Sequence, residues 1–568
     1  MAYLAREVPA LSVRAARVPA ATGRVRVPRP ARAALALVTL CVAGCGTPAP
    51  MPCSPLDLPR RGGPHILPGS YVGVPYATGG DRTLRFDLFL HDDSAPRPTA
   101  VILRGGDGET TIGERTSFIG QAVETMADAG YHVVLPDYSA SSARAAQDDL
   151  VDLFQTLRCH ASTLRVDEHA LVLVGEHSGG DVALRLTAHL GGLRRGRTAQ
   201  WPAPARATVV LGGTYDAVPP AIEDETLLVH GAADEAVPAA RAAAVCATAT
   251  EGTTCDVIEV AGASHRVENW WPSQWAYKAQ MVQWLADRLG TLPAAAWPDD
   301  PHLHKRVVFD EAHGLSLDAW TPDGEGPFPA VVLVHGGGWE AGDRVTYITP
   351  LLAPLAGRGI AWFSIDYRLT PEATVADQVA DVERAVAFVR SQHSRFRVDP
   401  SRLVLAGESA SGHLVTHLAT QSIDVAGVVS FYGVYDLAAM AGDPASPRSL
   451  ARRLFGFSTL DGAARETLRD YSPVANVSAG MPPLLLVTGT ADGLWPQAQA
   501  FEQALSAAGA SYESIVLPDA PHGMEQWNAD PRWRGWSTQV TDWIVRVTQR
   551  TRAATADAGR RPPGSSRP

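Results

Sequence analysis

Short apolar runs rich in β-branched residues alternate with amphipathic helical patterns over most of this 568-residue chain. The runs at Ala330–Val334 and Leu403–Ala406 are strand-like, whereas Val375–Arg390 has the apolar spacing of a helix. Continuous apolar strands separated by such helices are typical of an α/β fold with a mainly parallel sheet that helices cover on both faces. The stretches Leu84–Leu90 and Leu315–Trp320 predict an antiparallel hairpin at the start of each half.

The same series of motifs occurs twice, which predicts two tandem copies of one α/β unit. AVILRGGDG in the first half matches AVVLVHGGGW in the second, LVLVGEHSGG matches LVLAGESASG, and TLLVHGAADEAVP matches LLLVTGTADGLWP. The spacing agrees as well, because Arg104 and His177 are 73 positions apart while His335 and Ser409 are 74 apart. Each copy has the length of an ordinary domain.

The repeats and the composition of the segments around them divide the chain into six parts. We predict an export signal at 1–44, a tether at 45–65, a first domain at 66–291, a Pro-rich acidic linker at 292–305, a second domain at 306–550 and a disordered tail at 551–568.

The first 44 residues predict export from the cytoplasm. Four arginines between Arg24 and Arg32 precede the apolar run Ala33–Ala43, which is too short to span a bilayer but suits the core of a signal sequence. The run ends in VAGC, which resembles a bacterial lipoprotein box in which Cys45 is lipidated and becomes the N-terminus. An ordinary secretory signal cut nearby is the alternative. We therefore expect an extracytoplasmic protein that is anchored to the membrane by lipid or secreted.

Charge and cysteine content narrow the classes of partner. A formal net charge of −11 opposes binding to a phosphate backbone and argues against nucleic acid. Cys53, Cys159, Cys246 and Cys255 would remain after processing, and four cysteines allow three pairings in an oxidising compartment. Cys246 and Cys255 are close enough in sequence to join a helix end to the next strand. The spacings do not suggest a metal site, and we expect neither a metal nor an organic cofactor.

The second repeat carries the pieces of a nucleophilic site in the order Ser, Asp, His. Ser409 stands at a strand-to-helix turn, Asp492 follows a strand in LLLVTGTADGLWP, and His522 follows the last apolar strand. In this hypothesis His522 takes the proton from Ser409, while Asp492 orients the imidazole and stabilises its cation. Ser411 stands where a second glycine is usual, so we expect some strain there that the turn tolerates.

These motifs resemble the α/β-hydrolase superfamily, over about 66–290 for the weaker copy and about 305–548 for the stronger one. The second repeat resembles the branch of hormone-sensitive lipase and of feruloyl and acetyl-xylan esterases. The resemblance implies a serine carboxylesterase whose oxyanion hole is formed by Gly337, Gly338 and the amide of Ala410, with Trp339 lining the pocket. It implies esters of small or medium acyl groups, such as acetyl or feruloyl esters, carried by small molecules or polysaccharide. The second copy has 26 extra residues between the serine and the aspartate, which predict a partial cap over the site.

The first repeat keeps Asp234 and His265 but not the nucleophile. His177 is in register with the serine of the second repeat, and Ser178 comes one step later, where its side chain should point elsewhere. We predict a catalytically silent hydrolase domain. The alternative is a second active site that uses Ser178, Asp234 and His265.

The oxyanion segment of the first repeat has changed too, because Arg104 and Asp107 stand where the second repeat has histidine and glycine. An acid beside a forming oxyanion would oppose it. For the whole chain two other functions stay open: a serine peptidase or amidase of the same fold, and a non-catalytic binding protein at the cell surface.

Overall fold

The computed structural model contains two eight-stranded sheets, one in each half of the chain. The structure describes residues 53, 55–59, 67, 70–79, 82–92, 95–105, 112–113, 120–139, 142–196, 205–216, 221–222, 224–265, 267, 275–297, 300–446, 449–529 and 532–560. The predicted export signal and the lipidation site Cys45 lie outside these residues, as does Asp107.

In the first half the strand order is β1-β2-β5-β3-β7-β8-β9-β10, with a separate pair formed by β4 and β6. The strands are β1 (Ser70–Gly79), β2 (Arg82–Phe89), β3 (Arg97–Leu103), β4 (Ile112–Gly113), β5 (His132–Pro136), β6 (Tyr138–Ser139), β7 (Val166–Glu176), β8 (Ala207–Leu211), β9 (Glu225–Gly231) and β10 (Cys255–Val260). The helices are α1 (Gly120–Asp128), α2 (Ala143–Cys159), α3 (Ala161–Leu164), α4 (Ser178–Gly196), α5 (Ala240–Cys246) and α7 (Trp275–Leu289).

In the second half the order is β11-β12-β14-β13-β15-β16-β17-β18. The strands are β11 (Leu303–Asp310), β12 (Leu315–Trp320), β13 (Phe328–Val334), β14 (Ala361–Ile365), β15 (Val398–Glu408), β16 (Gly427–Phe431), β17 (Leu484–Gly489) and β18 (Tyr512–Leu517). The helices are η1 (Thr349–Leu351), α8 (Leu352–Gly357), α9 (Val375–Ser391), α10 (His393–Phe396), α11 (Ala410–Thr420), α12 (Leu450–Phe455), α13 (Gly462–Asp470), η2 (Pro473–Ala475), α14 (Trp495–Ala508), α15 (Met524–Ala529) and α16 (Trp536–Arg560).

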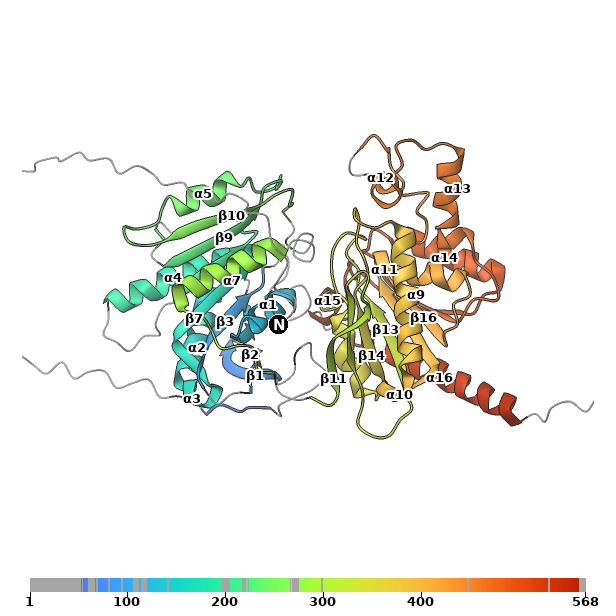
Figure 1. The fold of residues 1–568 in the computed structure, drawn as a ribbon, viewed down its shortest axis with the longest axis horizontal. Helices are drawn as coiled ribbons and strands as arrows, with labels where there is room; N and C mark the ends of the chain where they lie inside the picture. The colour runs from blue at the N-terminus through green and yellow to red at the C-terminus, as the bar shows by residue number, and fades with distance from the viewer. Residues whose placement is uncertain are drawn as a thin grey trace, which may run out of the picture.

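The two halves have the same connectivity, which confirms the predicted tandem α/β fold. Each eight-stranded sheet opens with an antiparallel hairpin whose second strand pairs antiparallel with the next strand of the sheet, and the remaining pairings in these two sheets are parallel. Helices lie over both faces of each sheet (Figure 1). The central parallel strands β14, β16 and β17 are buried along their whole length, since both of their faces are covered, whereas the edge strands β10 and β18 are largely half-buried or exposed. The predicted helix α9 begins with a capping box in which Thr374 and Asp377 each accept from the other's backbone N–H.

An apolar cluster crosses from one domain to the other. It includes Met126 on α1 and Met281 on α7, together with Val345, Ile348 and Trp527 of the second domain. Burying apolar surface in this shared cluster favours association of the two domains.

The boundary between the domains differs from the prediction at the linker. β11 begins at Leu303, so the second domain starts three residues before 306. The segment before it is docked rather than free, because the Arg97 guanidinium donates to the carbonyl oxygens of Pro293 and Ala294 at 3.2 and 3.0 Å. The linker is therefore held against the first domain.

The prediction of disorder from residue 551 is wrong for ten residues. α16 continues through Arg560, and residues 561–568 lie outside the described part of the chain. Once the first turns of a helix are fixed by packing, each added residue costs little, so a polar extension without apolar anchors can continue the helix.

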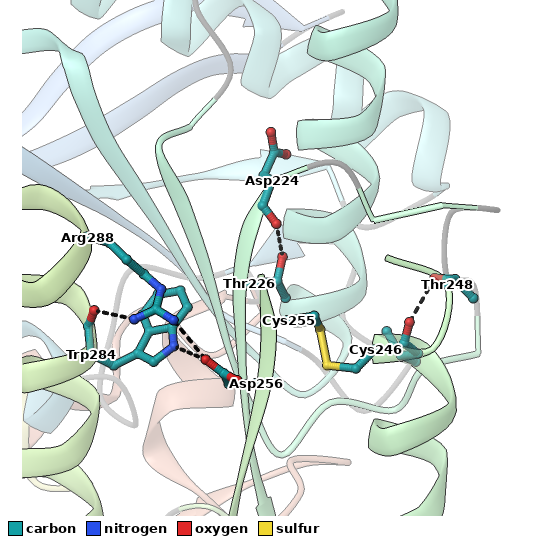
Figure 2. The surroundings of a disulfide bond; sticks show 9 residues. Asp224, Thr226, Cys246, Thr248, Cys255, Asp256, Trp284 and Arg288 are labelled. Atoms are coloured by element: carbon teal, nitrogen blue, oxygen red, sulfur yellow. Dashed lines mark hydrogen bonds and ion pairs between the residues drawn. A yellow bond between two sulfur atoms is a disulfide. The ribbon is translucent and has the colours of Figure 1, made fainter. Parts of the chain in front are cut away.

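Two disulfides settle the pairing that the sequence left open: Cys53 joins Cys159, and Cys246 joins Cys255. The second bond links the end of α5 to the start of β10 (Figure 2). Beside it Asp256 accepts hydrogen bonds from the Trp284 indole and the Arg288 guanidinium, both at 2.8 Å. This edge of the first sheet is thus held covalently and by side-chain bonds to α7.

Within the described residues, no helix combines the length and the apolar character needed to cross a bilayer.

Candidate active site

The nucleophile position is a tight strand-to-helix turn. β15 ends at Glu408, α11 begins at Ala410, and Ser409 between them has φ 53° and ψ −117°. A non-glycine residue with positive φ is strained, and such strain persists only where the surroundings impose it. A Cβ on Gly407 would lie 2.5 Å from the carbonyl oxygen of Ser411, so only glycine fits there. The turn lifts the Ser409 side chain to the carboxyl edge of the sheet.

The structure brings the three predicted residues of the second repeat together. Ser409 Oγ lies 3.0 Å from His522 Nε2, and His522 Nδ1 lies 2.7 Å from Asp492 Oδ2. The Asp492 side chain is 2% exposed, and its other oxygen accepts the backbone N–H of Leu494 at 2.8 Å. The His522 side chain is 42% exposed, so the imidazole is accessible from solvent whereas the carboxylate behind it is not. This geometry suits proton transfer from the serine to the imidazole.

Ser411, the departure from the usual motif, has structural bonds of its own. Its buried hydroxyl accepts the backbone N–H of Glu408 at 2.8 Å and lies 2.7 Å from the carbonyl oxygen of Val334, to which it can donate. Val334 is the last residue of β13. The hydroxymethyl group therefore joins the turn to the neighbouring strand instead of merely being tolerated.

The predicted oxyanion segment follows β13. Gly337 and Gly338 have φ of 111° and 62°, and a Cβ on Gly337 would lie 2.2 Å from the carbonyl oxygen of Ala341. Among the described residues, no acceptor takes the backbone N–H of Gly337 or Gly338. The amide of Ala410 stands at the first position of α11, where a helix has N–H groups without intrahelical partners. These donors have the character that an oxyanion requires.

His335 opens this segment and is structural. Its ring is buried and stacks on Tyr367 with ring centroids 4.4 Å apart. Nδ1 lies 2.8 Å from the Gly336 carbonyl oxygen, so this nitrogen carries the proton. Burial lowers the pKa of His335 to about 4, which keeps the ring neutral at physiological pH.

Sequence reasoning missed a network that ties the three loops of the site together. The Glu408 carboxyl group accepts the backbone N–H of Gly336 at 3.3 Å and the hydroxyl of Tyr432 at 2.5 Å. Tyr432 in turn accepts the backbone N–H of Met524 at 2.9 Å, and its ring centroid is 4.5 Å from that of His522. In the sequence this network is marked only by Glu408, an acid directly before Ser409, because no motif or spacing singles out Tyr432.

The 26 extra residues of the second repeat contribute α12, α13 and η2. Helix α11, which follows Ser409, contacts this segment through His413. His413 Nε2 lies 2.7 Å from the carbonyl oxygen of Tyr471, and the Trp339 indole donates to His413 Nδ1 at 3.3 Å. We expected Trp339 to line the pocket. Its side chain is instead buried, with 3% of the residue exposed, and it packs against His413. The predicted cap is thus fixed to both the nucleophile helix and the oxyanion segment.

In the first repeat the elbow carries an imidazole. His177 has φ 46°, as the turn requires, and Ser178 is the first residue of α4. His265 Nδ1 lies 2.8 Å from Asp234 Oδ2, so the acid and base are paired. His177 Nε2 lies 3.2 Å from the backbone oxygen of His265, and the two ring centroids are 5.0 Å apart. The structure thus brings His177, Asp234 and His265 together and places a ring where a hydroxyl would act.

The carboxylate of Asp234 also organises its own loop. One oxygen accepts the backbone N–H groups of Ala236 and Val237 at 2.9 and 2.8 Å, and the other lies 3.1 Å from His230 Nε2. Burial alone would raise the pKa of Asp234, but the Val237 amide and His265 outweigh it and lower that pKa. The hydrogen bonds of its own loop therefore hold Asp234 beside His265 whether or not a nucleophile is present.

No group of three or more His, Cys, Asp or Glu side chains in the described ranges is arranged to hold a metal ion.

Comparison with known proteins gives a family match within the second half and relatives over part of the chain. The family model described as BD-FAE matches residues 317–505. Esterase LipC of Mycobacterium tuberculosis (strain ATCC 25618 / H37Rv) is 29% identical over 269 residues, which cover 43% of this chain and 66% of LipC. The probable carboxylic ester hydrolase LipM of the same strain is 33% identical over 202 residues, 32% of this chain and 46% of LipM. Isoprenylcysteine alpha-carbonyl methylesterase ICME of Arabidopsis thaliana is 29% identical over 270 residues, 43% of this chain and 62% of ICME.

The chain thus spans between 46% and 66% of the length of these relatives. Among solved structures, Thermogutta terrifontis esterase 2 phosphonylated by cyclosarin is 25% identical with a TM-score of 0.35, covering 44% of this chain and 96% of that one. A truncated carbohydrate esterase from gut microbiota is 23% identical with a TM-score of 0.37, covering 44% and 99%. The chain contains two α/β domains whose eight-stranded sheets have the same strand order, and part of the chain is similar to proteins named as esterases.

Proposed function

We propose that the second domain hydrolyses carboxylic esters with Ser409 as nucleophile. The observation that carries this proposal is the hydrogen-bonded series from Ser409 Oγ to His522 Nε2 at 3.0 Å and from His522 Nδ1 to Asp492 Oδ2 at 2.7 Å. The match of the BD-FAE model to residues 317–505 and the similarity of part of the chain to proteins named as esterases support it.

In the proposed reaction Ser409 Oγ attacks the ester carbonyl carbon while His522 Nε2 takes the hydroxyl proton. The carbonyl oxygen becomes an oxyanion, which the N–H groups of Gly337, Gly338 and Ala410 stabilise. Collapse breaks the ester C–O bond, and His522 returns its proton to the departing alkoxide. Water then attacks the acyl-enzyme with His522 again as base, and the acid and free Ser409 result.

We propose small or medium acyl groups as substrates, with acetyl and feruloyl esters of small molecules or polysaccharide as candidates. The cap held by His413 and Tyr471 next to Ser409 supports a bounded acyl site. No metal or cofactor is part of the proposed reaction.

For the first domain we propose catalytic silence. The imidazole of His177 at the elbow supports this, because it stands where the second domain has its hydroxyl. The alternative site of Ser178, Asp234 and His265 is tested by Ser178→Ala, and a large loss of turnover in that variant with folding intact would refute silence.

We also propose that the protein is exported and anchored to the membrane through lipid on Cys45. The two disulfides support an oxidising compartment outside the cytoplasm. Metabolic labelling with a fatty-acid analogue, lost in Cys45→Ala, tests the anchor.

The test of the enzymatic proposal is a panel of acetyl, butyryl, feruloyl and octanoyl esters, measured with wild type and Ser409→Ala. We expect turnover of the shorter esters that Ser409→Ala abolishes, and labelling of Ser409 by a fluorophosphonate probe. Turnover of amides in place of esters would favour a peptidase or amidase. Folded protein that neither turns over esters nor reacts with the probe would refute the enzyme and favour a binding protein.

A further inference from the structure

The first domain contacts the second through a buried carboxylate, that of Glu124 on α1. Its oxygen atoms lie 2.8 Å from Lys305 Nζ and 3.1 and 3.3 Å from Arg344 Nη2, and Arg306 Nη2 is 3.5 Å away. All three cations belong to the second domain. The side chains of Glu124 and Arg344 are only 10% and 11% exposed, so salt screens this pair little.

Glu124 stays ionised in this position. Burial alone would raise its pKa, but the attraction of Lys305, Arg344 and Arg306 outweighs burial and holds the pKa well below its usual value. Removing the negative charge of Glu124 would leave three neighbouring cations that repel one another with one carboxylate fewer to neutralise them. The most buried of these cations is Arg344.

The Arg344 guanidinium is held on three sides. Nε donates to Asp318 at 3.1 Å and Nη1 donates to Asp366 at 3.2 Å, both in the second domain, while Nη2 donates to Glu124. The backbone N–H of Arg344 also donates to Asp366 at 3.0 Å. Glu124 is therefore the contribution of the first domain to fixing this arginine.

Arg344 is joined to the oxyanion segment with little slack. It comes two residues after Gly342, and a Cβ on Gly342 would lie 2.5 Å from His335 Nδ1 and 2.9 Å from the Gly336 carbonyl oxygen. A Cβ on Gly337 would meet the Ala341 carbonyl oxygen at 2.2 Å. A shift of Arg344 must therefore move the backbone that carries the proposed oxyanion donors.

A second helix of the first domain reaches the same loop. Lys278 on α7 is buried, and Asp343, next to Arg344, and Glu124 both attract its charge. Val345 packs in the apolar cluster that includes Met126 of α1. Charge and apolar contacts from α1 and α7 thus converge on residues 343–345.

We propose that the first domain positions the active site of the second: Glu124 fixes Arg344, and Arg344 sets the conformation of the segment His335–Gly342. The inference rests on the proposed ester hydrolysis by Ser409. Glu124 is a positioning residue, because it acts through Arg344 and not on the substrate. Such a positioning role would give the first domain a function although His177, and not a serine, stands at its strand-to-helix turn.

The test compares Glu124→Gln with Asp128→Asn in the full chain. Asp128 lies one turn along α1 and pairs with Arg306 across the same interface, but it does not contact the loop. Both variants remove one interdomain charge, so a general docking effect acts on both. We expect Glu124→Gln to lower kcat on an acetate ester by about tenfold or more, since small misplacement of catalytic groups is costly. KM should change by less than about twofold, and Asp128→Asn should keep the kcat of wild type.

Turnover is expressed per site labelled by a fluorophosphonate, so that loss of folded protein does not imitate loss of kcat. Arg344→Gln should lower kcat as well, and adding Glu124→Gln to it should have little further effect if the two residues act as one unit. Additive losses would overturn the route through Arg344. Equal kcat in Glu124→Gln and wild type would overturn the positioning role.

If Glu124→Gln does not fold, Glu124→Asp replaces it, because the shorter side chain keeps the charge but shortens the reach. We expect a smaller loss of kcat in the same direction, and an unchanged kcat would again refute the proposal. Absence of ester turnover in the wild type would instead refute the proposed function, so the two failures are distinguishable.

Discussion

Replacing Ser411 by glycine would restore the commoner Gly-x-Ser-x-Gly pattern, yet we expect the change to destabilise the second domain. The hydroxyl is fully buried, accepts the backbone N–H of Glu408 at 2.8 Å and can donate to the Val334 carbonyl oxygen at 2.7 Å. A glycine removes both bonds and leaves buried backbone groups to find other partners.

The magnitude follows from these two bonds. A buried donor left without its acceptor costs about 1–3 kcal/mol, and the bond to the carbonyl is worth about 0.5–1.5 kcal/mol. Ser411→Ala, which keeps the Cβ, should therefore lower the free energy of unfolding by about 1.5–4.5 kcal/mol. Ser411→Gly should cost a further ~0.5–1 kcal/mol, because glycine loses more backbone entropy in a helix.

The assay is urea unfolding of wild type and both variants, followed by tryptophan fluorescence and far-UV circular dichroism. Ser391→Ala is the matched control, since its hydroxyl donates to the Phe388 carbonyl oxygen at an exposed helix end. We expect that control to stay within about 0.5 kcal/mol of wild type. Ser411→Gly as stable as wild type, or more stable, would show that the hydroxyl contributes nothing and that the usual glycine is the better residue.

Three further predictions concern the triad, pH and the disulfide. Asp492→Asn should lower kcat on an acetate ester by roughly 10³–10⁴-fold with folding intact, measured by steady-state kinetics, because His522 loses the carboxylate that orients it. Burial lowers the pKa of His413 from 6.5 to about 3, so the folded state binds fewer protons than the unfolded chain; its contribution to stability is complete above pH 6.5 and lost as pH falls toward 3. The urea midpoint should fall over that range, and less steeply in His413→Gln. Replacing Cys246 and Cys255 together by serine should cost the first domain about 2–3 kcal/mol in thermal or urea unfolding, the value expected for so short a closed loop.

The sequence was sufficient to predict which residues meet at the second site, because the order and direction of the strands determine where these residues lie. Ser409, Asp492 and His522 are far apart in the chain, but each follows a strand of the parallel part of the sheet. The carboxyl ends of parallel strands share one edge, so residues just beyond them are brought together whatever their separation in sequence. Apolar runs mark those strands locally, which makes both the fold and the meeting of these side chains accessible to pattern reasoning.

What the sequence could not provide depends on contacts between distant groups. The hydroxyl of Ser411 could be recognised as unusual, but only coordinates show that it reaches the Val334 carbonyl oxygen. Tyr432 stands at the end of a strand with no distinguishing pattern, yet it joins Glu408 to the loop that carries the histidine. The pairing of Glu124 with Arg344 joins residues 220 positions apart in different domains. No local periodicity encodes such contacts.

The two copies together show which parts of a nucleophilic site are independent of one another. In the first domain Asp234 and His265 remain paired at 2.8 Å although the elbow carries His177. Asp234 also accepts two backbone N–H groups of its own loop, so folding alone is enough to hold it. An intact acid–histidine pair is therefore weak evidence for activity, whereas the residue at the positive-φ turn decides whether a hydroxyl is presented. By this reasoning a tandem chain can lose the chemistry of one copy and keep its shape, and a kept shape can still act on its neighbour through surfaces such as α1.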